Sequence, residues 1–499
     1  MTAHLVIAPV LAPFLAGAVL LLCGRSVSLR RVLSTLAVLL QCALAVTLLV
    51  AVSDGGILVY RLGDWPPPWG IVLVADRLAA WMILITTLLA LCAVVQASGG
   101  TDQQGRHFHV FFQMQLFGLA GAFLTGDLFN LFVFFEVLLI ASYCLQLHGG
   151  GAARTRAGLH YVVLNLLGSA VFLFAAGLIY ASLGTLNMAE IAVRAAQVAA
   201  QDLGLARSGG LLLLTVFALK AALLPLLLWL PPAYAATTAP VAALFAILTK
   251  VGLYAILRGH TLWFGVEAGE IAGLFAPWLL PLGLATIGIG AIGVLAAPDL
   301  RRLAAWLVIV SSGTLLTAFG FGIDGTAAGL YYLAHGTFAV ALLFLLAGAI
   351  RRRRPVHGDF LEPGIDLPRH GLWGGIYFAT AIAAVGLPPL SGFLAKFLIL
   401  QAAVGQPLVW VVVLAAALVC LIALARSGSQ MFLNKRTASP DATVEPESAS
   451  RELLAIGGLL GLIVALTVGA GPVVDFSRAA AAQLADPSAY IAAVIGAGR

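Results

Sequence analysis

Apolar runs of about 20 residues recur along almost the whole chain, and their length limits the fold that the chain can adopt. An α-helix rises about 1.5 Å per residue, so about 20 apolar residues cross the hydrocarbon core of a bilayer. Because 62% of the residues are hydrophobic and only 10% are charged, soluble domains with polar surfaces are excluded. We therefore predict an all-α polytopic membrane protein with about 14 transmembrane helices, in the runs near 5–23, 33–52, 77–97, 108–125, 128–147, 158–183, 210–229, 241–258, 275–296, 303–322, 328–350, 372–400, 408–426 and 452–470.

The loops between these runs differ in basic charge, which indicates how the chain is oriented. Cytoplasmic loops of membrane proteins carry an excess of Lys and Arg. The basic loops all lie on one side, which we expect to be the cytoplasm, so both termini should face the outer side of a bacterial inner (cell) membrane. Three, one, two, two, five and four basic residues lie in the loops 24–32, 98–107, 148–157, 297–302, 351–371 and 426–451.

Composition also narrows the classes of partner and cofactor. The net charge of +6 does not indicate a nucleic-acid partner, because the arginines fall in short loops rather than on one patch. Nothing resembles a nucleotide-binding loop or a nucleophile triad, so we expect no cofactor. The cysteines lie within or beside apolar runs without CxxC or Cys/His spacing, which implies neither a metal site nor a disulfide framework; they are Cys23, Cys42, Cys92, Cys144 and Cys420.

Charged residues inside the apolar runs are the strongest functional signal. Glu136 is the one acidic residue that lies well inside such a run. Of four lysines, Lys435 lies in a loop, but the other three lie in apolar segments: Lys220, Lys250 and Lys396. A charge at bilayer depth costs about 2.5 kcal/mol or more, so it is retained only beside a partner or water. Arginine stays protonated almost everywhere, whereas a buried lysine can release its proton near neutral pH. This distribution predicts proton handling within the membrane.

Two of the apolar runs contain prolines close to a lysine. Lys220 precedes Pro225, and Lys396 follows the pair Pro388-Pro389. Proline removes a backbone donor and clashes with the preceding turn, so we predict that helices 7 and 12 break at membrane depth. Broken helices beside a charge in both halves of a chain point to inverted repeats around an ion path. The alternative is a pair of packing kinks.

Other polar groups within the runs could extend a proton path. Lys250 lies about nine residues, roughly 13 Å, from the nearer end of its run, and Tyr254 lies one turn away on the same face. His335 could pass a proton through its two ring nitrogens, although it could also be a satisfied core histidine. Three hydroxyls of the tenth run could hold a water wire, with helix–helix hydrogen bonding as the more ordinary interpretation; they belong to Ser311, Ser312 and Thr314.

Several motifs resemble a known superfamily. The segment Thr125-Gly-Asp127-Leu-Phe-Asn130-Leu-Phe-Val-Phe-Phe-Glu136-Val-Leu-Leu-Ile-Ala-Ser-Tyr143 is similar to the fifth-helix signature of the antiporter-like subunits of Mrp-type cation/proton antiporters, respiratory complex I and membrane hydrogenases. A resemblance to the D subunits of Mrp complexes is carried by the stretches Asn165-Leu-Leu-Gly168-Ser169, Gly184-Thr-Leu-Asn187-Met-Ala189, Phe217-Ala-Leu-Lys220 and Leu387-Pro-Pro-Leu-Ser391-Gly392-Phe393.

This resemblance implies a fold and a division of the chain. It implies 14 helices with two inverted five-helix repeats, in which helices 7 and 12 are broken. The expected units are helices 1–3, a first repeat of helices 4–8, a second repeat of helices 9–13, and helix 14 with a short tail. They correspond to residues 1–107, 108–258, 275–426 and 452–499.

The resemblance also implies a proton path along the membrane. Glu136 would pair with Lys220, and protons would pass through Lys250 and His335 to Lys396. The family often has a lysine four residues after the histidine, where this chain has Ala339. If that lysine is needed for transfer between the halves, His335 must act with water, or the second half conducts differently.

The leading hypothesis is a membrane subunit of a multisubunit monovalent cation (Na⁺)/proton antiporter, which is a secondary transporter rather than an enzyme. Its expected partners are other hydrophobic subunits, membrane lipid, protons and Na⁺, with no nucleic acid. No carboxylate cluster for sodium is present in the sequence. The alternative is a proton-pumping subunit of a complex I-like NADH:quinone oxidoreductase or a membrane-bound hydrogenase. Three intramembrane lysines disfavour an inactive scaffold, because each is costly to retain.

Overall fold

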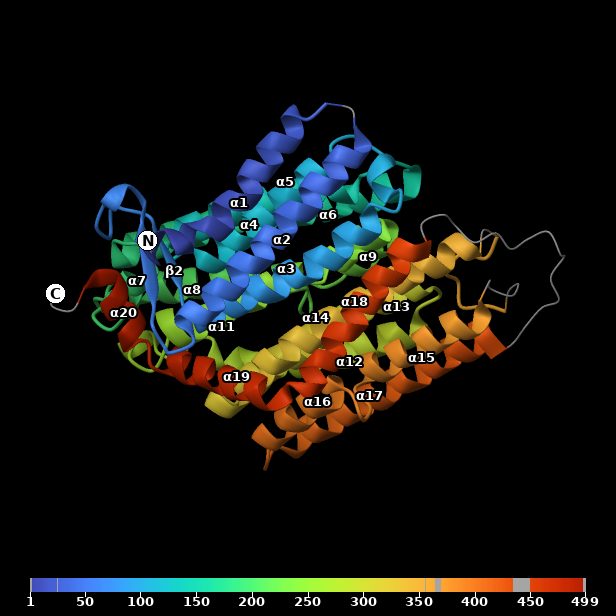
Figure 1. The fold of residues 1–499 in the computed structure, drawn as a ribbon. Coiled ribbons are helices and arrows are strands. Elements are labelled where there is room, and N and C mark those ends of the chain that lie inside the picture. The colour runs from blue at the N-terminus through green and yellow to red at the C-terminus, as the bar shows by residue number, and fades with distance from the viewer. Residues whose placement is uncertain (1, 25, 355, 364–368, 434–448, 497–499) are drawn as a thin grey trace.

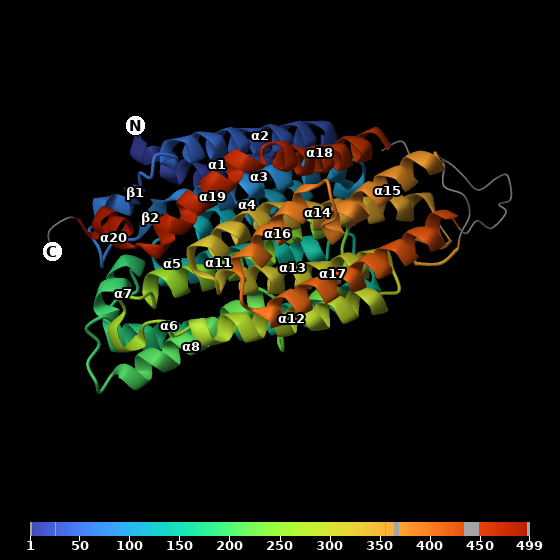
Figure 2. The same ribbon diagram turned by 90° about the horizontal axis from the view of Figure 1, so that it is seen from below.

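The structure is a computed structural model that describes residues 2–24, 26–354, 356–363, 369–433 and 449–496. Lys435 and parts of the basic loops expected at 351–371 and 426–451 lie outside the described residues. Most helices run along one common direction (Figure 1). Both views place the β strands, α7 and α20 at the same end of the bundle (Figure 2).

The first half of the described chain contains eleven α-helices, two strands and short 3-10 or π turns. Their bounds are α1 (Thr2–Leu22), α2 (Val27–Val52), β1 (Leu58–Arg61), η1 (Leu62–Asp64), β2 (Val72–Ala75), α3 (Arg77–Ala97), η2 (Thr101–Gln103), α4 (Phe108–Leu124), α5 (Leu128–Gln146), α6 (Ala152–Leu183), α7 (Met188–Ala195), α8 (Leu203–Lys220), α9 (Leu230–Ala236), α10 (Ala239–Phe245), α11 (Leu248–Arg258), η3 (Gly259–Trp263) and η4 (Gly269–Ile271).

The regular elements in the second half of the described chain are all helices. Its bounds are α12 (Ala276–Ala296), α13 (Leu300–Phe319), α14 (Gly322–Arg353), α15 (His370–Val385), α16 (Ser391–Ala402), α17 (Pro407–Gly428), η5 (Ser429–Leu433), α18 (Ala449–Val468), α19 (Ala470–Ala485) and α20 (Ser488–Ile495).

Twelve helical segments of the described chain are long and apolar enough to cross a membrane. The two other apolar runs of the sequence correspond to α4, which has 17 residues, and to α15 with α16, which are separated by a break. The prediction of an all-helical polytopic membrane protein is confirmed. The count of 14 spans and the inverted relation of two repeats stay predictions.

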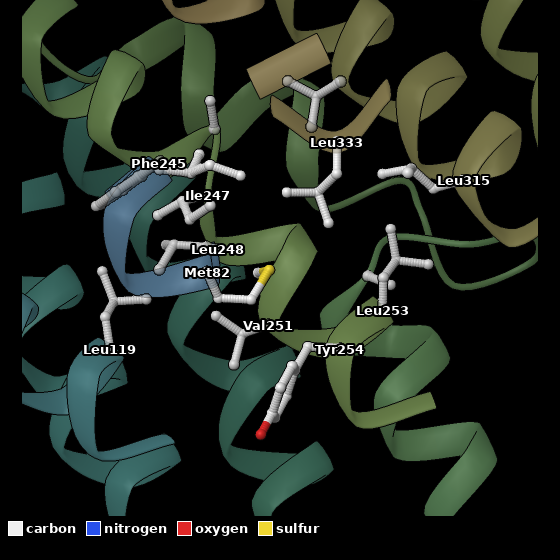
Figure 3. Packing of buried hydrophobic residues seen from close by; sticks show 14 of the residues in the cluster. Met82, Leu119, Phe245, Ile247, Leu248, Val251, Leu253, Tyr254, Leu315 and Leu333 are labelled. Carbon is white, nitrogen blue, oxygen red and sulfur yellow. The ribbon is translucent and has the colours of Figure 1, made fainter. Parts of the chain in front are cut away.

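The most enclosed helices are those that carry Lys250 and His335. In the span formed by α10, α11 and η3, every residue of the most apolar 18-residue segment is buried. In α14, 94% of the corresponding segment is buried. α14 packs against α3, α10, α13, α16, α18 and α19. Figure 3 shows the apolar packing around the start of α11, where residues of α3, α4, α13 and α14 converge; the labelled side chains include Met82, Leu119, Phe245, Leu248, Val251, Leu315 and Leu333. Polar groups on these two segments are therefore shielded from lipid.

A small hairpin and the last two helices close one end of the bundle. β1 and β2 are antiparallel, with Leu58 opposite Ala75. α19 packs on α14, and α20 packs on α7 and β1. At this end Arg258 of α11 binds Asp76, the N-cap of α3, through contacts of 2.6 and 2.7 Å, and the Tyr490 ring of α20 lies 5.4 Å from the same guanidinium. The residues after α18 thus tie both halves of the chain together.

The structure contains the two helix breaks predicted from proline. α8 ends at Lys220 and α9 begins only at Leu230, while α15 ends at Val385 and α16 begins at Ser391. A third break, between α10 and α11, lies at 246–247, a few residues before Lys250. It was not predicted, because its two residues are Ala and Ile rather than proline or glycine.

Candidate functional site

Glu136 of α5 and Lys220 of α8 are linked through α6 rather than in direct contact. Ser169 Oγ donates to Glu136 Oε1 and also lies 3.1 Å from the carbonyl oxygen of Asn165. The Lys220 ammonium donates to the same carbonyl at 3.2 Å and to Asn165 Oδ1 at 3.3 Å. Within the described residues Glu136 and Lys220 form no ion pair, so the expected charge pair is present only in a bridged form.

The bridge depends on how closely α6 and α8 approach. Asn165 and Ser169 are four residues apart, so they lie on the same face of α6. Between them, Gly168 faces α8, and a Cβ added there would lie 2.7 Å from Leu219 Cδ2 and 3.8 Å from Lys220 Cε. The absence of a side chain at Gly168 therefore lets the end of α8 reach the polar face of α6.

The break after Lys220 is held by side chains that replace helical hydrogen bonds. Ala222 has φ +52°, which turns the chain out of the helix. Trp229 Nε1 donates to the Leu219 carbonyl at 3.1 Å, and the Leu224 amide donates to Thr286 Oγ1 at 3.0 Å. The two contacts anchor the backbone on both sides of the break, where the Leu219 carbonyl also accepts from the Ala222 amide at 3.1 Å. Because Thr286 belongs to α12, the second half fixes a break in the first.

Lys250 makes its polar contact across the boundary between the halves. Its side chain is buried, and its ammonium donates to Thr249 Oγ1 at 3.3 Å and to Ser311 Oγ of α13 at 3.2 Å. No hydrogen bond joins the side chains of Lys250 and Lys220 in the described chain. α11 nevertheless touches the end of α8 closely, since a Cβ at Gly252 would lie 2.7 Å from the Phe217 carbonyl oxygen.

Ser311 also lines a small cavity. About 20 Å³ of it is available to the centres of water molecules, and one water needs about 10–15 Å³ by this measure, so it has room for a water. Its polar lining comes from α13, α14, α16 and α17, and includes Ser311, Thr314, Tyr332, His335, Lys396 and Cys420. The cavity therefore brings the contact of Lys250 and the two predicted relay groups of the second half to one place.

His335 is bound at both ring nitrogens. Nε2 lies 3.1 Å from the Ala383 carbonyl oxygen, which can only accept, so Nε2 carries a proton. Nδ1 lies 2.9 Å from Ser391 Oγ, the first residue of α16, and this hydroxyl also lies 3.3 Å from the Ile463 carbonyl. When His335 is neutral, Ser391 donates to Nδ1. When His335 is protonated, Nδ1 donates to Ser391, whose own proton turns to Ile463. Both protonation states thus keep their hydrogen bonds.

Lys396 lies on the second broken helix and reaches back across the break. Its ammonium donates to the Val385 carbonyl at 2.5 Å, at the last residue of α15. A cation at a helix C-terminus is favoured by the helix dipole and by the free carbonyl groups there. The side chain is only half-buried. Lys396 is therefore the least buried of the predicted groups that line the cavity.

The supporting residues predicted from the sequence do not all join this series. Tyr254 donates to the Phe123 carbonyl at 2.8 Å and accepts from Arg258, so it belongs to the buried Asp76–Arg258 pair. Thr314 lines the cavity, although its hydroxyl donates to the Val310 carbonyl. Ser312 Oγ is buried, without a hydrogen-bond partner in the described structure.

Three residues that hold these groups have no role predicted from the sequence. Asn165 and Ser169 connect Glu136 to Lys220, and Ser391 binds His335. Each lies in a stretch quoted for the family resemblance, but polar uncharged residues are common in membrane helices, so their type alone is not a signal. Their positions in the sequence could have indicated these roles. Asn165 and Ser169 share one helical face, and Ser391 opens the helix that follows a break.

Several buried carboxylates outside the membrane spans have a shifted pKa, and Asp102 is one of them. Asp102 of η2 accepts from Arg31 at 2.7 and 2.8 Å, and His109 Nε2 lies 3.2 Å away. Burial by itself raises the pKa of Asp102, but the hydrogen bonds from Arg31 and His109 outweigh it and hold the pKa well below its usual range. The cluster is thus an ion pair at neutral pH and joins the start of α2 to the α3–α4 connection.

Comparison with known proteins identifies the family. Residues 125–422, more than half of the chain, match the family model described as NADH:quinone oxidoreductase/Mrp antiporter, TM. The chain is 40% identical to the D subunit of a probable K⁺/H⁺ antiporter of Rhizobium meliloti, over 99% of this chain and 98% of that one. It is 37% identical to the D subunit of the Na⁺/H⁺ antiporter of Alkalihalophilus pseudofirmus, over 99% of both chains.

A solved structure supports the same assignment. The chain superposes on a chain in the structure of the Mrp complex from Dietzia sp. DQ12-45-1b with a TM-score of 0.86, at 27% identity and over 99% of each chain. Two independent kinds of comparison, one of sequence and one of fold, therefore agree over nearly the full length. The chain belongs to the NADH:quinone oxidoreductase/Mrp antiporter family of membrane subunits and is an antiporter subunit of the D type.

Proposed function

We propose that this subunit carries protons between its two halves through Lys250, Ser311 and the cavity that Ser311 shares with His335. The observation that carries the proposal is the 3.2 Å contact between the buried Lys250 ammonium and Ser311 Oγ. A buried lysine without a carboxylate partner is costly in a membrane, so its retention calls for a function. A proton released by Lys250 could pass through Ser311 toward two further titratable groups, His335 and Lys396.

In the first half, Lys220 acts as a switchable cation. Its ammonium donates a hydrogen bond to Asn165, while the Ser169 hydroxyl donates one to Glu136. The Ser169 hydroxyl has one proton and two acceptors, so it can serve Glu136 or the Asn165 carbonyl, but not both at once. When it turns to Asn165, Glu136 is free to draw the flexible lysine side chain into an ion pair. Movement of Lys220 between Asn165 and Glu136 would then control when a proton is passed toward Lys250.

In the second half, water replaces the lysine that the family often carries at the position of Ala339. Ala339 lines the same cavity as His335 and Lys396, and its small side chain leaves room there. A proton from Lys250 would cross Ser311 and one cavity water to Lys396. His335 can take a proton only at Nδ1, because Nε2 already carries one, so transfer to His335 would pass through the Ser391 hydroxyl. His335 can accept it without losing a hydrogen bond, because Ser391 changes from donor to acceptor.

The transported ions are protons and a monovalent cation. The relatives are named for different cations, K⁺ in Rhizobium meliloti and Na⁺ in Alkalihalophilus pseudofirmus, and we expect Na⁺ for this chain. We propose that the subunit works with other hydrophobic subunits in the cell membrane, with both termini on the outer side. In the described chain, no group of three or more His, Cys, Asp or Glu residues could hold a metal ion. We therefore place the cation path in a partner subunit.

Replacing Glu136 by Ala tests the proposal. In everted membrane vesicles energised to an acidic interior, addition of Na⁺ or K⁺ to the intact complex should dissipate the pH gradient. The Glu136→Ala complex should assemble normally but give no cation-dependent signal, because nothing remains to draw Lys220 from Asn165. Glu267→Ala, which removes a carboxylate from an exposed loop, is the matched control and should retain exchange. A cation-dependent pH change in Glu136→Ala vesicles as large as that of the unmodified complex would refute the proposal.

A further inference from the structure

A large basic pocket opens at the end of the bundle opposite the β hairpin. About 720 Å³ of it is available to water-sized spheres. It is lined by the N-terminal end of α6, by α9, by the beginning of α13 and by the end of α14, so both halves of the chain contribute. None of the residues in the proposed proton series lines it. Its basic side chains are Arg154, Arg156, His160, Arg301, Arg302 and Arg351.

The charge of this pocket is not balanced by the described residues around it. Asp299 is the one carboxylate in the described lining, and it lies 3.3 Å from Arg302. Asp359, which does not line the pocket, binds Arg301 at 2.9 Å. These two carboxylates leave three of the five guanidinium groups uncompensated. Arg154 donates to the backbone carbonyls of His148 and Ala236.

Arg156 and Arg351 are the cations available to a ligand. Among the described residues neither guanidinium group forms an ion pair or a hydrogen bond, and both side chains are exposed to the pocket. Guanidinium groups bind phosphate oxygens in pairs of parallel hydrogen bonds, and an excess of three positive charges suits a ligand that carries two phosphates.

The surroundings of the pocket favour a lipid as the source of the phosphate. Apolar side chains next to it are strongly exposed, with Leu159 64%, Val163 55% and Leu228 70% exposed. Acyl chains could cover these side chains while the headgroup occupies the pocket. The pocket lies beside the loops 148–157 and 297–302, on the side expected to face the cytoplasm, where basic pockets between membrane helices attract anionic headgroups.

We propose that this pocket binds the headgroup of an anionic phospholipid with two phosphate groups, of the diphosphatidylglycerol class. The lipid would bridge the two halves, since Arg154 and Arg156 belong to α6, whereas Arg301 and Arg351 belong to α13 and α14. Its phosphates would lie between Arg156 and Arg351, with its acyl chains along Leu159 and Leu228. The site is separate from the proton path, so it stands or falls independently of the proposed transport.

Native mass spectrometry of the purified complex, stripped of lipid and titrated with diphosphatidylglycerol, tests this site. The double variant Arg156→Gln/Arg351→Gln should bind the lipid about tenfold to thirtyfold more weakly, because two guanidinium contacts are lost. The matched control Arg207→Gln/Arg478→Gln makes the same charge change at exposed positions outside the pocket and should bind lipid like the unmodified complex.

Two further measurements in the same experiment distinguish a lipid phosphate from a free phosphate. Phosphatidylcholine with the same acyl chains should bind this site at least about tenfold more weakly, because it brings no net negative charge. Inorganic diphosphate should compete poorly, because it lacks the acyl chains. The proposal is overturned if diphosphate displaces the lipid at equal concentration, if phosphatidylcholine binds equally well, or if both double variants lose lipid to the same extent.

Discussion

Replacing Ser311 by Ala removes the contact on which the proposed proton transfer between the halves depends. The Ser311 hydroxyl lies 3.2 Å from the Lys250 ammonium and faces the cavity that contains His335. A hydrogen bond to a charged group contributes about 1.5–3 kcal/mol, and about 1.4 kcal/mol corresponds to a factor of ten. If transfer from Lys250 limits exchange, Ser311→Ala should lower the exchange rate about tenfold to a hundredfold.

Ser312→Ala is a matched control for this change. It removes the same hydroxyl from the next residue of α13, but Ser312 Oγ is buried without a hydrogen-bond partner in the described structure. Its removal relieves an unsatisfied polar atom, so the Ser312→Ala complex should be at least as stable as the parent and should exchange at the parental rate. Both variants should assemble to the same level, which immunoblots of purified complexes would establish.

The assay is the initial rate of cation-dependent gradient dissipation in everted vesicles, compared at equal amounts of assembled complex. Ser311→Thr keeps the hydroxyl and should retain more exchange than Ser311→Ala. Parental exchange by Ser311→Ala would refute the assignment of Ser311 to the path. An equal loss in Ser312→Ala would show that α13 tolerates no change here, and the specific role of Ser311 would then be wrong.

Three further predictions follow from the same contacts. Gly336→Ala should slow exchange without removing a polar group, because the added Cβ would lie 2.8 Å from Ser311 Oγ and displace it; combined with Ser311→Ala in the vesicle assay, the two losses should not add. Ser391→Ala should slow exchange about tenfold, because His335 Nδ1 loses its 2.9 Å partner, and equal rates in vesicles of Ser391→Ala and the parent would contradict this. Asp102→Asn should keep exchange but lower the melting temperature of the complex by about 2–5 °C at neutral pH. Because the pKa of Asp102 is held below its usual range, its contribution is complete well above about pH 4 and is lost as the pH falls below that value, so thermal-shift curves of parent and variant should converge in acid.

The sequence alone identified the groups that a membrane makes costly. Glu136, the three intramembrane lysines and His335 were found because ionisable residues stand out against apolar helices. The breaks beside Lys220 and Lys396 were found because proline removes a backbone donor. These signals are local, so they need no knowledge of which helices touch. The break before Lys250 has no such signal and was missed.

Tertiary structure decided which of these groups meet. The Glu136–Lys220 pair turned out to be bridged by Asn165 and Ser169, which depends on the close approach of α6 to α8 at Gly168. Tyr254, one turn from Lys250, points instead to the Asp76–Arg258 pair.

Ser311 and Ser312 show the physical reason most directly. Consecutive residues of a helix point about 100° apart, so the sequence contains two equivalent hydroxyls, and the rotation of α13 against α11 and α14 decides which one faces Lys250. That rotation is set by apolar packing of residues far apart in the chain, such as Leu315 with its neighbours in Figure 3. The sequence determined which ionisable groups lie in the membrane spans; the packing of the helices determined which of them lie close enough to exchange protons in the proposed path.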